Sequence, residues 1–359
     1  MFSRKTRTIT VGNVKIGGGA PVSIQSMTNT DTRDVEATLG QITRLRDAGC
    51  EIVRLAVPDM EAAEALDRIV RGAPLPVVAD IHFDYRLALR AVKAGVAKIR
   101  INPGNIGDEG RVRAVAQSCR EAGVPIRIGV NGGSLSRDIL AKFGAPTPEA
   151  MVESALLQAK MLEDAGFFDI AVSLKSSSVR DTVAANVSFA KLSDIPLHVG
   201  VTETGTARMG LIKSAAGIGG LLALGVGETM RVSLTSDPVE EIAAARDILA
   251  AVGLRRDRPE LISCPTCGRC RIDLIPLANE VEQKLKDFNG YIKVAVMGCA
   301  VNGPGEAREA DIGIAGGDGD AVLFIKGEIV RKLPRDQIVS GLMDEIRKQY
   351  PGKFTGRGV

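Results

Sequence analysis

Aromatic residues are scarce in this chain. Phe, Tyr and Trp make up 3% of its 359 residues and Trp is absent, although 45% of the residues are hydrophobic. The core must therefore be built from Val, Ile, Leu and Ala. Such a composition favours packed layers of helices and parallel strands. The length allows two domains, one of which could hold about 250 residues.

Strong net charge and long apolar runs are also lacking. The formal charge of +3 is too small to indicate a nucleic-acid surface, and no basic run is interleaved with aromatic residues. The most apolar stretch, Ala215 to Gly227, is short and interrupted by Gly, so it does not predict a membrane span. No apolar signal core follows Met1 to Lys5. We therefore expect a soluble cytoplasmic protein with neither a nucleic-acid nor a membrane partner.

Cysteine is infrequent but clustered. Four of the six cysteines lie in two segments, with Cys264, Cys267 and Cys270 in the first and Cys299 in the second. In a reducing compartment such thiols are expected to be ligands rather than disulfides. Three thiols spaced by two residues on one loop, closed by a fourth from another loop, are typical of an iron-sulfur cluster. Zinc is the main alternative, although its sites usually take two closely spaced pairs, and chance clustering of buried thiols is the other.

The remaining Cys, His and Gly residues carry weaker signals. Cys50 and Cys119 have no ligand spacing, so we interpret both as packing residues. His82 and His198 are interpreted first as structural residues, with a catalytic role as the alternative. The glycines of Gly217 to Gly220 lack the Lys and the Ser or Thr of a P-loop, and we interpret them as a turn.

Short β-rich runs alternate with helical stretches through the first part of the chain. Eight such runs are present: Val22 to Met27, Glu51 to Val57, Pro76 to Ile81, Lys98 to Asn102, Ile126 to Val130, Asp169 to Leu174, Leu197 to Val201 and Met230 to Leu234. Several helical stretches end in the same way, with a helix-closing Gly just before the next strand: Gly49, Gly95, Gly123 and Gly166. Eight β-then-α units in about 250 residues predict a closed (β/α)8 TIM barrel of the α/β class rather than an open sheet.

A hairpin precedes the repeats and a second domain follows them. Thr8 to Val11 and Val14 to Ile16 predict the hairpin. The last barrel helix is expected at Val239 to Val252, and the charged residues 255–260 mark the boundary between a barrel domain at 1–254 and a small α+β iron-sulfur domain at 261–359. The elements expected in that second domain are Leu274 to Phe288 (helix), Tyr291 to Met297, Ile312 to Ala315 and Val322 to Ile325 (strands), and Asp336 to Gln349 (helix).

Polar side chains gather at the carboxyl ends of the predicted strands, where a (β/α)8 barrel carries its active site. They are Arg54, Asp80, His82, Arg100, Asn102, Arg127, Asn131, Ser173, Lys175, His198, Thr202, Glu203, Arg231 and Ser233. Long cations inside apolar strands are costly unless an anion or a carboxylate offsets their charge. Because guanidinium groups match phosphate oxygens, the four arginines and the lysine predict a small phosphorylated substrate. Internal ion pairs, for example between Asp80 and an Arg, are the alternative.

Five segments carry a resemblance to a known family. They are Gln25 to Thr30, Val78 to Phe83, Lys98 to Asn105, Ser263 to Arg269 and Asn302 to Glu306. Together they resemble the 4-hydroxy-3-methylbut-2-enyl diphosphate synthases, in their two-domain bacterial form, over essentially the whole chain. The resemblance implies an iron-sulfur oxidoreductase that opens and dehydrates 2-C-methyl-D-erythritol 2,4-cyclodiphosphate in the methylerythritol phosphate route to isoprenoids. A cluster-bearing electron carrier or regulator with a non-catalytic barrel is the alternative.

The resemblance also implies which residues act. The expected ligands of a 4Fe-4S cluster are Cys264, Cys267, Cys299 and Glu306. The expected substrate-binding residues are Arg54, Asp80, Arg100, Arg127, Asn131, Lys175, Glu203, Arg231 and Ser233. Glu203 and Glu306 are also the expected catalytic residues, Glu203 as an acid-base or hydrogen-bonding group.

Cys270 is a departure from the family pattern, which normally has another residue at this position. Spacing alone nominates Cys270 as a cluster ligand, whereas the resemblance nominates Glu306. We favour Glu306, because a carboxylate binds a soft iron-sulfide core less firmly than a thiolate does and can give way to a substrate oxygen.

The resemblance further implies an external electron donor of the flavodoxin or ferredoxin type and a head-to-tail homodimer. In a barrel the last helix ends at the face opposite the active site. The connection from Gly253 to Leu261 reaches at most about 30 Å when stretched, and it would have to climb past a helix of about 20 Å and cross the rim. An extended linker with Pro259 could barely manage this, so each cluster domain is expected to cap the barrel of a partner subunit, with its own barrel as the alternative.

Overall fold

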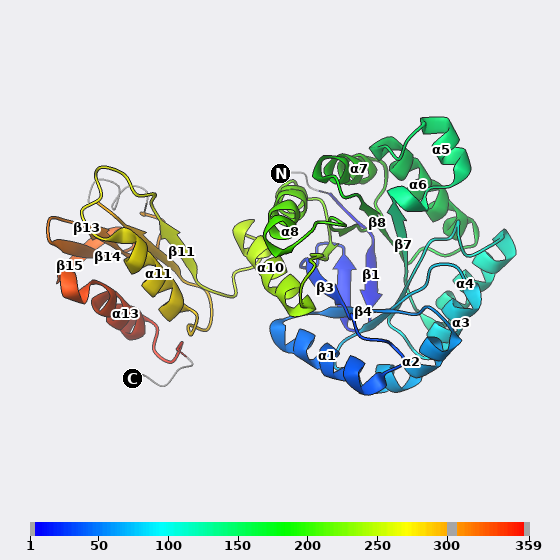
Figure 1. The fold of residues 1–359 in the computed structure, drawn as a ribbon, viewed down its shortest axis with the longest axis horizontal. Helices are drawn as coiled ribbons and strands as arrows, with labels where there is room; N and C mark the ends of the chain where they lie inside the picture. Colours follow the sequence, from blue (N-terminus) through cyan, green and yellow to red (C-terminus); the bar gives the residue numbers. More distant parts are fainter. Residues whose placement is uncertain (1–3, 300–306, 355–359) are drawn as a thin grey trace. The chain divides into compact units, whose positions relative to one another are not determined.

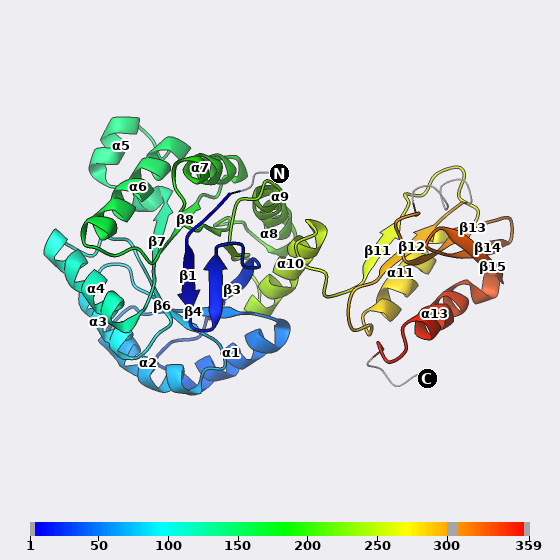
Figure 2. The same ribbon diagram turned by 180° about the vertical axis from the view of Figure 1, so that it is seen from behind.

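The computed structural model describes residues 4–299 and 307–354. The chain divides into two compact units, residues 1–254 and 255–359 (Figures 1 and 2). Each unit has a hydrophobic core of its own. None of the described helices combines the length and the apolar character needed to span a bilayer.

The first unit is built around eight parallel strands (Figure 1). They are β3 (Ser23–Met27), β4 (Ile52–Ala56), β5 (Val77–Asp80), β6 (Lys98–Ile101), β7 (Ile126–Asn131), β8 (Ile170–Lys175), β9 (His198–Val199) and β10 (Thr229–Met230). Neighbours pair in the order β8-β7-β6-β5-β4-β3-β10-β9. A parallel bridge between Val172 and Leu197 joins the two ends of this row. The predicted (β/α)8 TIM barrel is confirmed.

Helices surround the barrel strands (Figures 1 and 2). They are α1 (Val35–Ala48), α2 (Met60–Gly72), α3 (Tyr85–Lys93), α4 (Glu109–Ala122), α5 (Arg137–Phe143), α6 (Pro148–Asp164), α7 (Val179–Leu192), α8 (Ala207–Ser214), α9 (Gly220–Ala223) and α10 (Pro238–Ala251). The first four begin at an aspartate whose side chain accepts a hydrogen bond from the helix backbone: Asp34, Asp59, Asp84 and Asp108. The predicted helix-closing glycines have positive φ angles that suit Gly: Gly49, Gly95, Gly123 and Gly166.

The glycine-rich segment after α8 is helical, so the predicted turn at Gly217 to Gly220 is wrong. A π-helical stretch, Ala215–Gly219, connects α8 to α9 without a break. A Cβ atom at Gly217 would lie 2.6 Å from Cγ2 of Val201. Glycine is present here because the helix packs closely against the chain that follows β9, and not because the backbone turns.

The predicted hairpin closes the N-terminal end of the barrel. Its strands are β1 (Thr8–Val11) and β2 (Val14–Gly17), paired antiparallel. Three of its side chains are buried among residues at the beginnings of barrel strands, and the members of this cluster are Ile9, Val11, Ile16, Ile52, Val78 and Ala171. The floor of the barrel is therefore apolar, and polar side chains are concentrated above it.

The second unit is a five-stranded sheet with two helices. The strands are β11 (Glu260–Ser263), β12 (Lys293–Met297), β13 (Ile312–Gly316), β14 (Asp320–Ile325) and β15 (Glu328–Pro334), paired in that order. The helices are α11 (Leu274–Leu285) and α13 (Ile338–Gln349), and they share one core with the sheet (Figure 1). A smaller cluster that includes Ala295, Met297 and Phe324 is separate from this core.

Two strands of this sheet, β11 and β15, were not predicted. Both lie at the edges of the sheet. The first five residues of β15 are exposed, and no residue of β11 is buried. An edge strand with little burial lacks the alternation of apolar and polar residues by which a strand is found in a sequence.

Candidate active site

A cavity of about 250 Å³ lies at the carboxyl ends of the barrel strands. Eight of the nine predicted substrate-binding residues line it: Arg54, Asp80, Arg100, Arg127, Asn131, Lys175, Arg231 and Ser233. These residues belong to β4 to β8 and to the chain after β10. Successive side chains of a strand point alternately into and out of the barrel, and these point inward. The structure thus brings five cations to one site.

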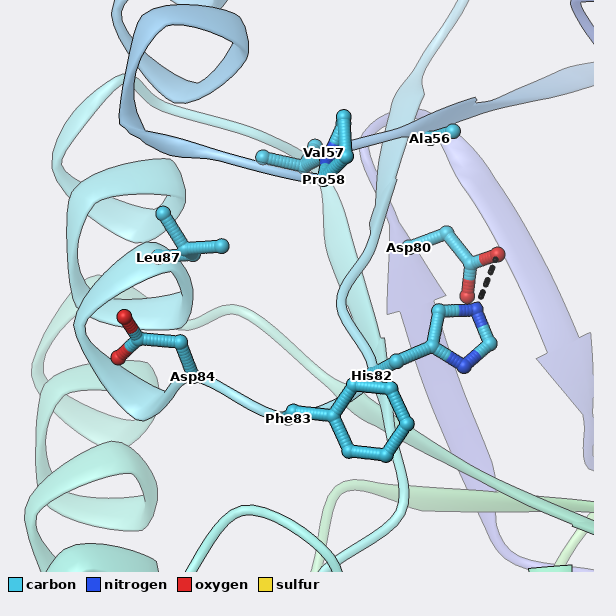
Figure 3. Close-up of a pocket in the computed structure, with 8 residues that line it drawn as sticks. All are labelled: Ala56, Val57, Pro58, Asp80, His82, Phe83, Asp84 and Leu87. Atoms are coloured by element: carbon cyan, nitrogen blue, oxygen red, sulfur yellow. Dashed lines mark ion pairs between the residues drawn. The ribbon is translucent and has the colours of Figure 1, made fainter.

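Asp80 is the centre of a charged cluster in this cavity. Its Oδ1 lies 3.3 Å from Nη1 of Arg100, and its Oδ2 lies 3.8 Å from Nε of Arg54 and 3.5 Å from Nε2 of His82 (Figure 3). Burial opposes ionisation of Asp80, but Arg54, His82 and Arg100 outweigh it and hold its pKa below the usual range. Burial lowers the pKa of Arg54 to about 10 despite the nearby carboxylate. The ion pair that the sequence left open as an alternative is therefore present for these arginines.

Arg231 has a carboxylate partner of its own. Its Nη2 and Nε lie 3.3 Å from Oε1 and Oε2 of Glu241, which is 3% exposed on α10. Glu241 also accepts hydrogen bonds from Oγ of Ser26 at 2.9 Å and from the backbone N–H of Leu234 at 3.1 Å. This network fixes the orientation of the guanidinium group.

Arg127 and Lys175 are the two cations of the cavity that have no carboxylate within 4.0 Å among the described residues. Arg127 is 1% exposed, and its Nη1 donates to Oγ of Ser173 at 3.1 Å. Its Nε and Nη2 have no hydrogen-bond partner in the part of the chain that the structure describes. Burial, followed by the charge of nearby arginines, lowers the pKa of both groups. Among the described residues, internal ion pairs therefore do not account for the burial of these two cations.

A second pocket, of about 320 Å³, adjoins the cationic cavity (Figure 3). The two share Asp80 and His82. The rest of its lining is mostly apolar: Ala56, Val57, Pro58, Phe83, Asp84 and Leu87. The cationic cavity thus lies on one side of His82 and the mostly apolar pocket on the other, and His82 itself is half-exposed.

The clustered cysteines line one small cavity in the second unit. Its volume is about 110 Å³, and its lining contains all four thiols: Cys264, Cys267, Cys270 and Cys299. Cys264 follows β11 directly and Cys299 follows β12 by two residues. Because these strands are parallel neighbours, with Ser263 opposite Val296, their carboxyl ends bring the two loops together.

The two cysteine loops also contact each other through hydrogen bonds. The N–H of Gly298 donates to Sγ of Cys264 at 3.2 Å. Cys267 is exposed, and the N–H and the guanidinium group of Arg269 lower the pKa of its thiol. Glu306, the fourth predicted ligand, lies outside the described residues. Cys50 and Cys119 are buried in the first unit, where burial raises the pKa of each thiol to about 12.

Two domains of one known family match most of the chain. The GcpE TIM-barrel domain matches residues 6–246, and the GcpE protein C-terminal domain matches residues 260–348. The chain belongs to the GcpE family. A relative from Geobacter sulfurreducens named 4-hydroxy-3-methylbut-2-en-1-yl diphosphate synthase (flavodoxin) is 58% identical over 344 residues, or 96% of this chain and 98% of the relative. One of the same name from Clostridium perfringens is 57% identical over 346 residues, covering 96% and 99%.

Two solved structures of low sequence identity are similar to part of this chain. A sialic acid synthetase from Leptospira borgpetersenii aligns with a TM-score of 0.50 at 14% identity, covering 70% of this chain and 92% of that one. A truncated 3-deoxy-D-arabino-heptulosonate 7-phosphate synthase from Thermotoga maritima aligns with a TM-score of 0.51 at 15% identity, covering 69% and 94%. At such identity these likenesses show the fold alone. The family resemblance seen in the sequence motifs is confirmed by the GcpE matches.

Glu203 is the one predicted substrate residue of this GcpE chain that does not line the cavity. It is exposed and follows Thr202, which does line the cavity. Its φ of +54° is in the left-handed region, where a residue other than Gly is under strain of about 1 kcal/mol. On its other side, the hydroxyl of Thr204 donates to the carbonyl oxygen of Ser233. Glu203 therefore occupies a constrained bend at the rim.

Two buried polar residues near the GcpE cavity were missed in the sequence. Glu241 falls on the apolar face of α10 together with Pro238, Ile242 and Ala245, and a carboxylate in that pattern is a signal for a buried partner. Lys98 is fully buried, with Nζ at 3.4 Å from Oε1 of Gln25. It precedes Arg100 by two residues, so the alternation of the strand places both on the inner face.

The two histidines of the chain differ in their surroundings. His198 is fully buried and neither ring nitrogen has a hydrogen-bond partner among the described residues. Burial and four nearby cations lower its pKa. His82 instead contacts Asp80 and Arg100 at the cavity wall. His82 is thus the histidine available to a bound ligand.

Proposed function

We propose that the chain catalyses the reductive ring opening and dehydration of 2-C-methyl-D-erythritol 2,4-cyclodiphosphate to 4-hydroxy-3-methylbut-2-enyl diphosphate. Its GcpE relatives, at 58% and 57% identity over nearly their full length, carry the name of this synthase. The observation that carries the proposal is the cationic cavity, in which Arg127 and Lys175 have no carboxylate partner among the described residues. A cyclic diphosphate supplies the missing negative charge in a form that guanidinium groups can grip.

The expected role of each cationic residue in binding depends on whether it has a carboxylate partner within the protein. Arg127 and Lys175 would bind phosphate oxygens, since no carboxylate of the described residues pairs with either of them. Arg54 and Arg100 share Asp80, and Arg231 is held by Glu241, so these groups are pre-oriented before the ligand arrives.

Two neutral side chains and the adjoining pocket complete the binding site. Asn131 and Ser233 offer hydrogen bonds at the cavity wall. The apolar pocket beyond His82 suits the hydrocarbon side of the ligand. The site thus offers cations, neutral donors and an apolar surface to different parts of one small molecule.

The thiols of the second unit fit an iron-sulfur cluster. Cys264, Cys267 and Cys299, with Glu306 as the fourth ligand, would hold a 4Fe-4S cluster. The thiols line a cavity of about 110 Å³, which supports a core of several atoms. When bound, such a cluster supplies electrons one at a time to a substrate whose C–O bond is broken.

Glu203 is the proposed acid-base or hydrogen-bonding residue near the reacting carbons. The constrained bend at Thr202 and Thr204 supports this role, because strained backbone persists where surrounding contacts fix it and is frequent at functional sites. The hydroxyl that departs as water must gain a proton, and a carboxylic acid at the rim can donate one.

The names of the relatives support a proposal for the electron donor, and the short connection between the two units supports one for the assembly. The names of the relatives specify flavodoxin, and we propose a donor of the flavodoxin or ferredoxin type for this chain. We also propose a head-to-tail homodimer in which each cluster serves the barrel of the partner subunit. The short connection supports it, since α10 ends at Ala251 and β11 begins at Glu260. Fully stretched, that connection reaches about 30 Å.

The decisive experiment is analysis of anaerobically purified protein. Iron and sulfide content, the electronic spectrum and turnover of the cyclic diphosphate with reduced flavodoxin are measured on one preparation. Cluster, binding and turnover together are the expected result. The alternative, an electron carrier or regulator with a non-catalytic barrel, would show the cluster but no affinity for the diphosphate in calorimetry. Bound zinc without sulfide would overturn the cluster assignment.

A further inference from the structure

Cys267 and Cys270 are the ends of one tight turn. The backbone N–H of Cys270 donates to the carbonyl oxygen of Cys267 at 3.0 Å, and Gly268 and Arg269 form the corner. The first and fourth Cα atoms of such a turn lie within about 7 Å. Disulfides join Cα atoms that are about 4.4 to 6.8 Å apart. The Cα separation that this turn allows thus overlaps the range that a disulfide spans.

The surroundings of the two sulfur atoms differ in a way that suits a reactive thiol and its resolving partner. Cys267 is exposed, whereas Cys270 is half-buried. Sγ of Cys270 donates to the carbonyl oxygen of Ile272 at 3.1 Å. It also lies against Gly298 so closely that a Cβ atom there would be 2.6 Å from it. Cys267 is thus the more accessible of the two thiols to an oxidant from solution, and Cys270 is three residues away at the other end of the same turn.

The other two thiols of the cavity are less suited to pair with Cys267. Cys264 is engaged by the N–H of Gly298, which donates to its sulfur at 3.2 Å. No backbone hydrogen bond closes a turn between Cys264 and Cys267 in the described loop. Cys299 is 6% exposed and comes from the other loop. The local geometry thus selects one pair out of the four cysteines.

We propose that Cys267 and Cys270 form a reversible disulfide when the chain carries no cluster, with a peroxide as the oxidant. The thiolate of Cys267 attacks one oxygen of hydrogen peroxide, so that an S–O bond forms and the O–O bond breaks. The hydroxide released takes up the proton that the thiol lost, which leaves the sulfenic acid of Cys267 and one water. Sγ of Cys270 then attacks that sulfur, the S–S bond forms and a second water leaves. The two thiols lose two electrons and two protons in total, and the peroxide is reduced to two waters.

This disulfide makes cluster loading depend on the redox state of the chain, an inference that rests on the cluster ligands of the proposed function. Cys267 is a proposed ligand and Cys270 is not, so a bridge between them removes one ligand. Loading must then wait for a dithiol reductant. The same bridge keeps exposed Cys267 from passing to the sulfinic acid, which ordinary thiols do not reverse.

The test uses the full-length chain freed of iron and sulfide by a chelator under anaerobic conditions. One equivalent of hydrogen peroxide is added, free thiols are counted and the peptides are mapped by mass. The expected result is the loss of two thiols, both found in a Cys267–Cys270 bridge. Dithiothreitol should restore both thiols and the uptake of iron and sulfide to the level of the untreated chain.

Two substitutions at position 270 and one matched control sharpen the result. In Cys270→Ser and Cys270→Ala, Cys267 should be trapped by dimedone as the sulfenic acid. After excess peroxide and then reductant, these variants should take up about ten-fold less iron than the wild type. Cys119→Ser, which removes a buried thiol of the first unit, should behave like the wild type.

Recovery of iron uptake in both position-270 variants to the wild-type level would overturn the proposal, as would a bridge mapped to Cys264 and Cys267. The thiol count and the peptide map need no iron. Failure of the untreated wild type to take up a cluster would therefore count against the proposed function, while a mapped Cys267–Cys270 bridge would still establish the disulfide.

Discussion

Arg231 and Glu241 form a two-pronged ion pair that joins the end of a barrel strand to the helix after it. Both nitrogen-to-oxygen distances are 3.3 Å, and Glu241 is 3% exposed. The carboxylate thus fixes a guanidinium group that lines the cationic cavity.

Glu241→Gln should lower the free energy of unfolding by about 3 kcal/mol, because it leaves the half-buried charge of Arg231 without its carboxylate partner. The cyclic diphosphate should offset part of that loss. We expect a larger ligand-induced rise in Tm for this variant than for the wild type, measured by thermal denaturation. Glu240→Gln, at an exposed neighbouring position on α10, is the matched control. An equal rise in Tm for all three chains would show that Arg231 does not meet the ligand.

Arg127→Ala should weaken binding of the cyclic diphosphate by about 2 kcal/mol, or roughly thirty-fold in Kd, because a charge-assisted contact is lost. Arg231→Ala should have an effect of similar size, and Lys175→Ala a milder one, since an ammonium group is less directional. Titration calorimetry measures all three. Arg113→Ala serves as the control, since Arg113 pairs with Glu109 on the exposed side of α4. Unchanged Kd in both arginine variants would leave these residues with structural roles only.

Ligand binding should be accompanied by proton uptake at Lys175. Burial, and then the charges of Arg127 and Arg54, lower its pKa well below 10.5 in the free chain. A bound anion opposes both effects and raises that pKa. Calorimetry in buffers of different ionisation enthalpy should detect the uptake, and Lys175→Gln should reduce it. Identical uptake in the variant would assign the proton to another group.

The lowered pKa of Lys175 also determines whether the free energy of unfolding rises or falls with pH. Between the lowered pKa of Lys175 and the ordinary value, the unfolded chain binds more protons than the folded chain. The free energy of unfolding of the free protein therefore rises with pH in that window. Lys175→Gln should flatten this slope in denaturant titrations at a series of pH values.

Cys264→Ser, Cys267→Ser and Cys299→Ser should each prevent cluster assembly, because each removes a proposed ligand. Cys270→Ser should retain iron, sulfide and activity under anaerobic conditions. Glu306→Ala should keep a cluster with an altered spectrum and turn over poorly. Iron and sulfide analysis with electronic spectra checks these outcomes. A cluster lost in Cys270→Ser would reassign the fourth ligand from Glu306 to Cys270.

Mixing an Arg231→Ala chain with a Cys299→Ser chain should restore part of the activity that neither variant has alone. In a head-to-tail dimer, one of the two composite sites would contain an intact barrel and an intact cluster. Native mass spectrometry must show that subunits have exchanged. Absence of activity after proven exchange would place each cluster over its own barrel.

The sequence predicted the barrel because its signal is repeated. Each inner strand is apolar on the side that packs against helices, and several helices end at a glycine such as Gly49 or Gly123, so eight similar units reinforce one another. The edge strands β11 and β15 have few buried residues and no repeat, and they were missed. The helical glycines near Gly217 were misjudged, because close packing and chain reversal both favour glycine.

The candidate site was predictable where the alternation of a strand places a charge inside the barrel, as for Arg54 and Arg127. Partners from other elements were not predictable in the same way. Glu241 reaches Arg231 from a helix, and that contact depends on the packing of α10 rather than on local spacing. The rim position of Glu203 depends on a left-handed residue, for which side-chain pattern carries no signal.

The apolar floor formed by the hairpin affects how small molecules enter and leave the barrel. Ile9, Val11 and Ile16 are buried against the beginnings of the strands, so the described residues close the barrel at this end and the cavity lies at the other. Substrate, product and the released water should all pass through the end at which the strands finish, and a fresh substrate molecule should not displace the product from behind. Departure therefore precedes entry in each cycle, and the product should act as a competitive inhibitor whose own exit limits how soon the next round begins.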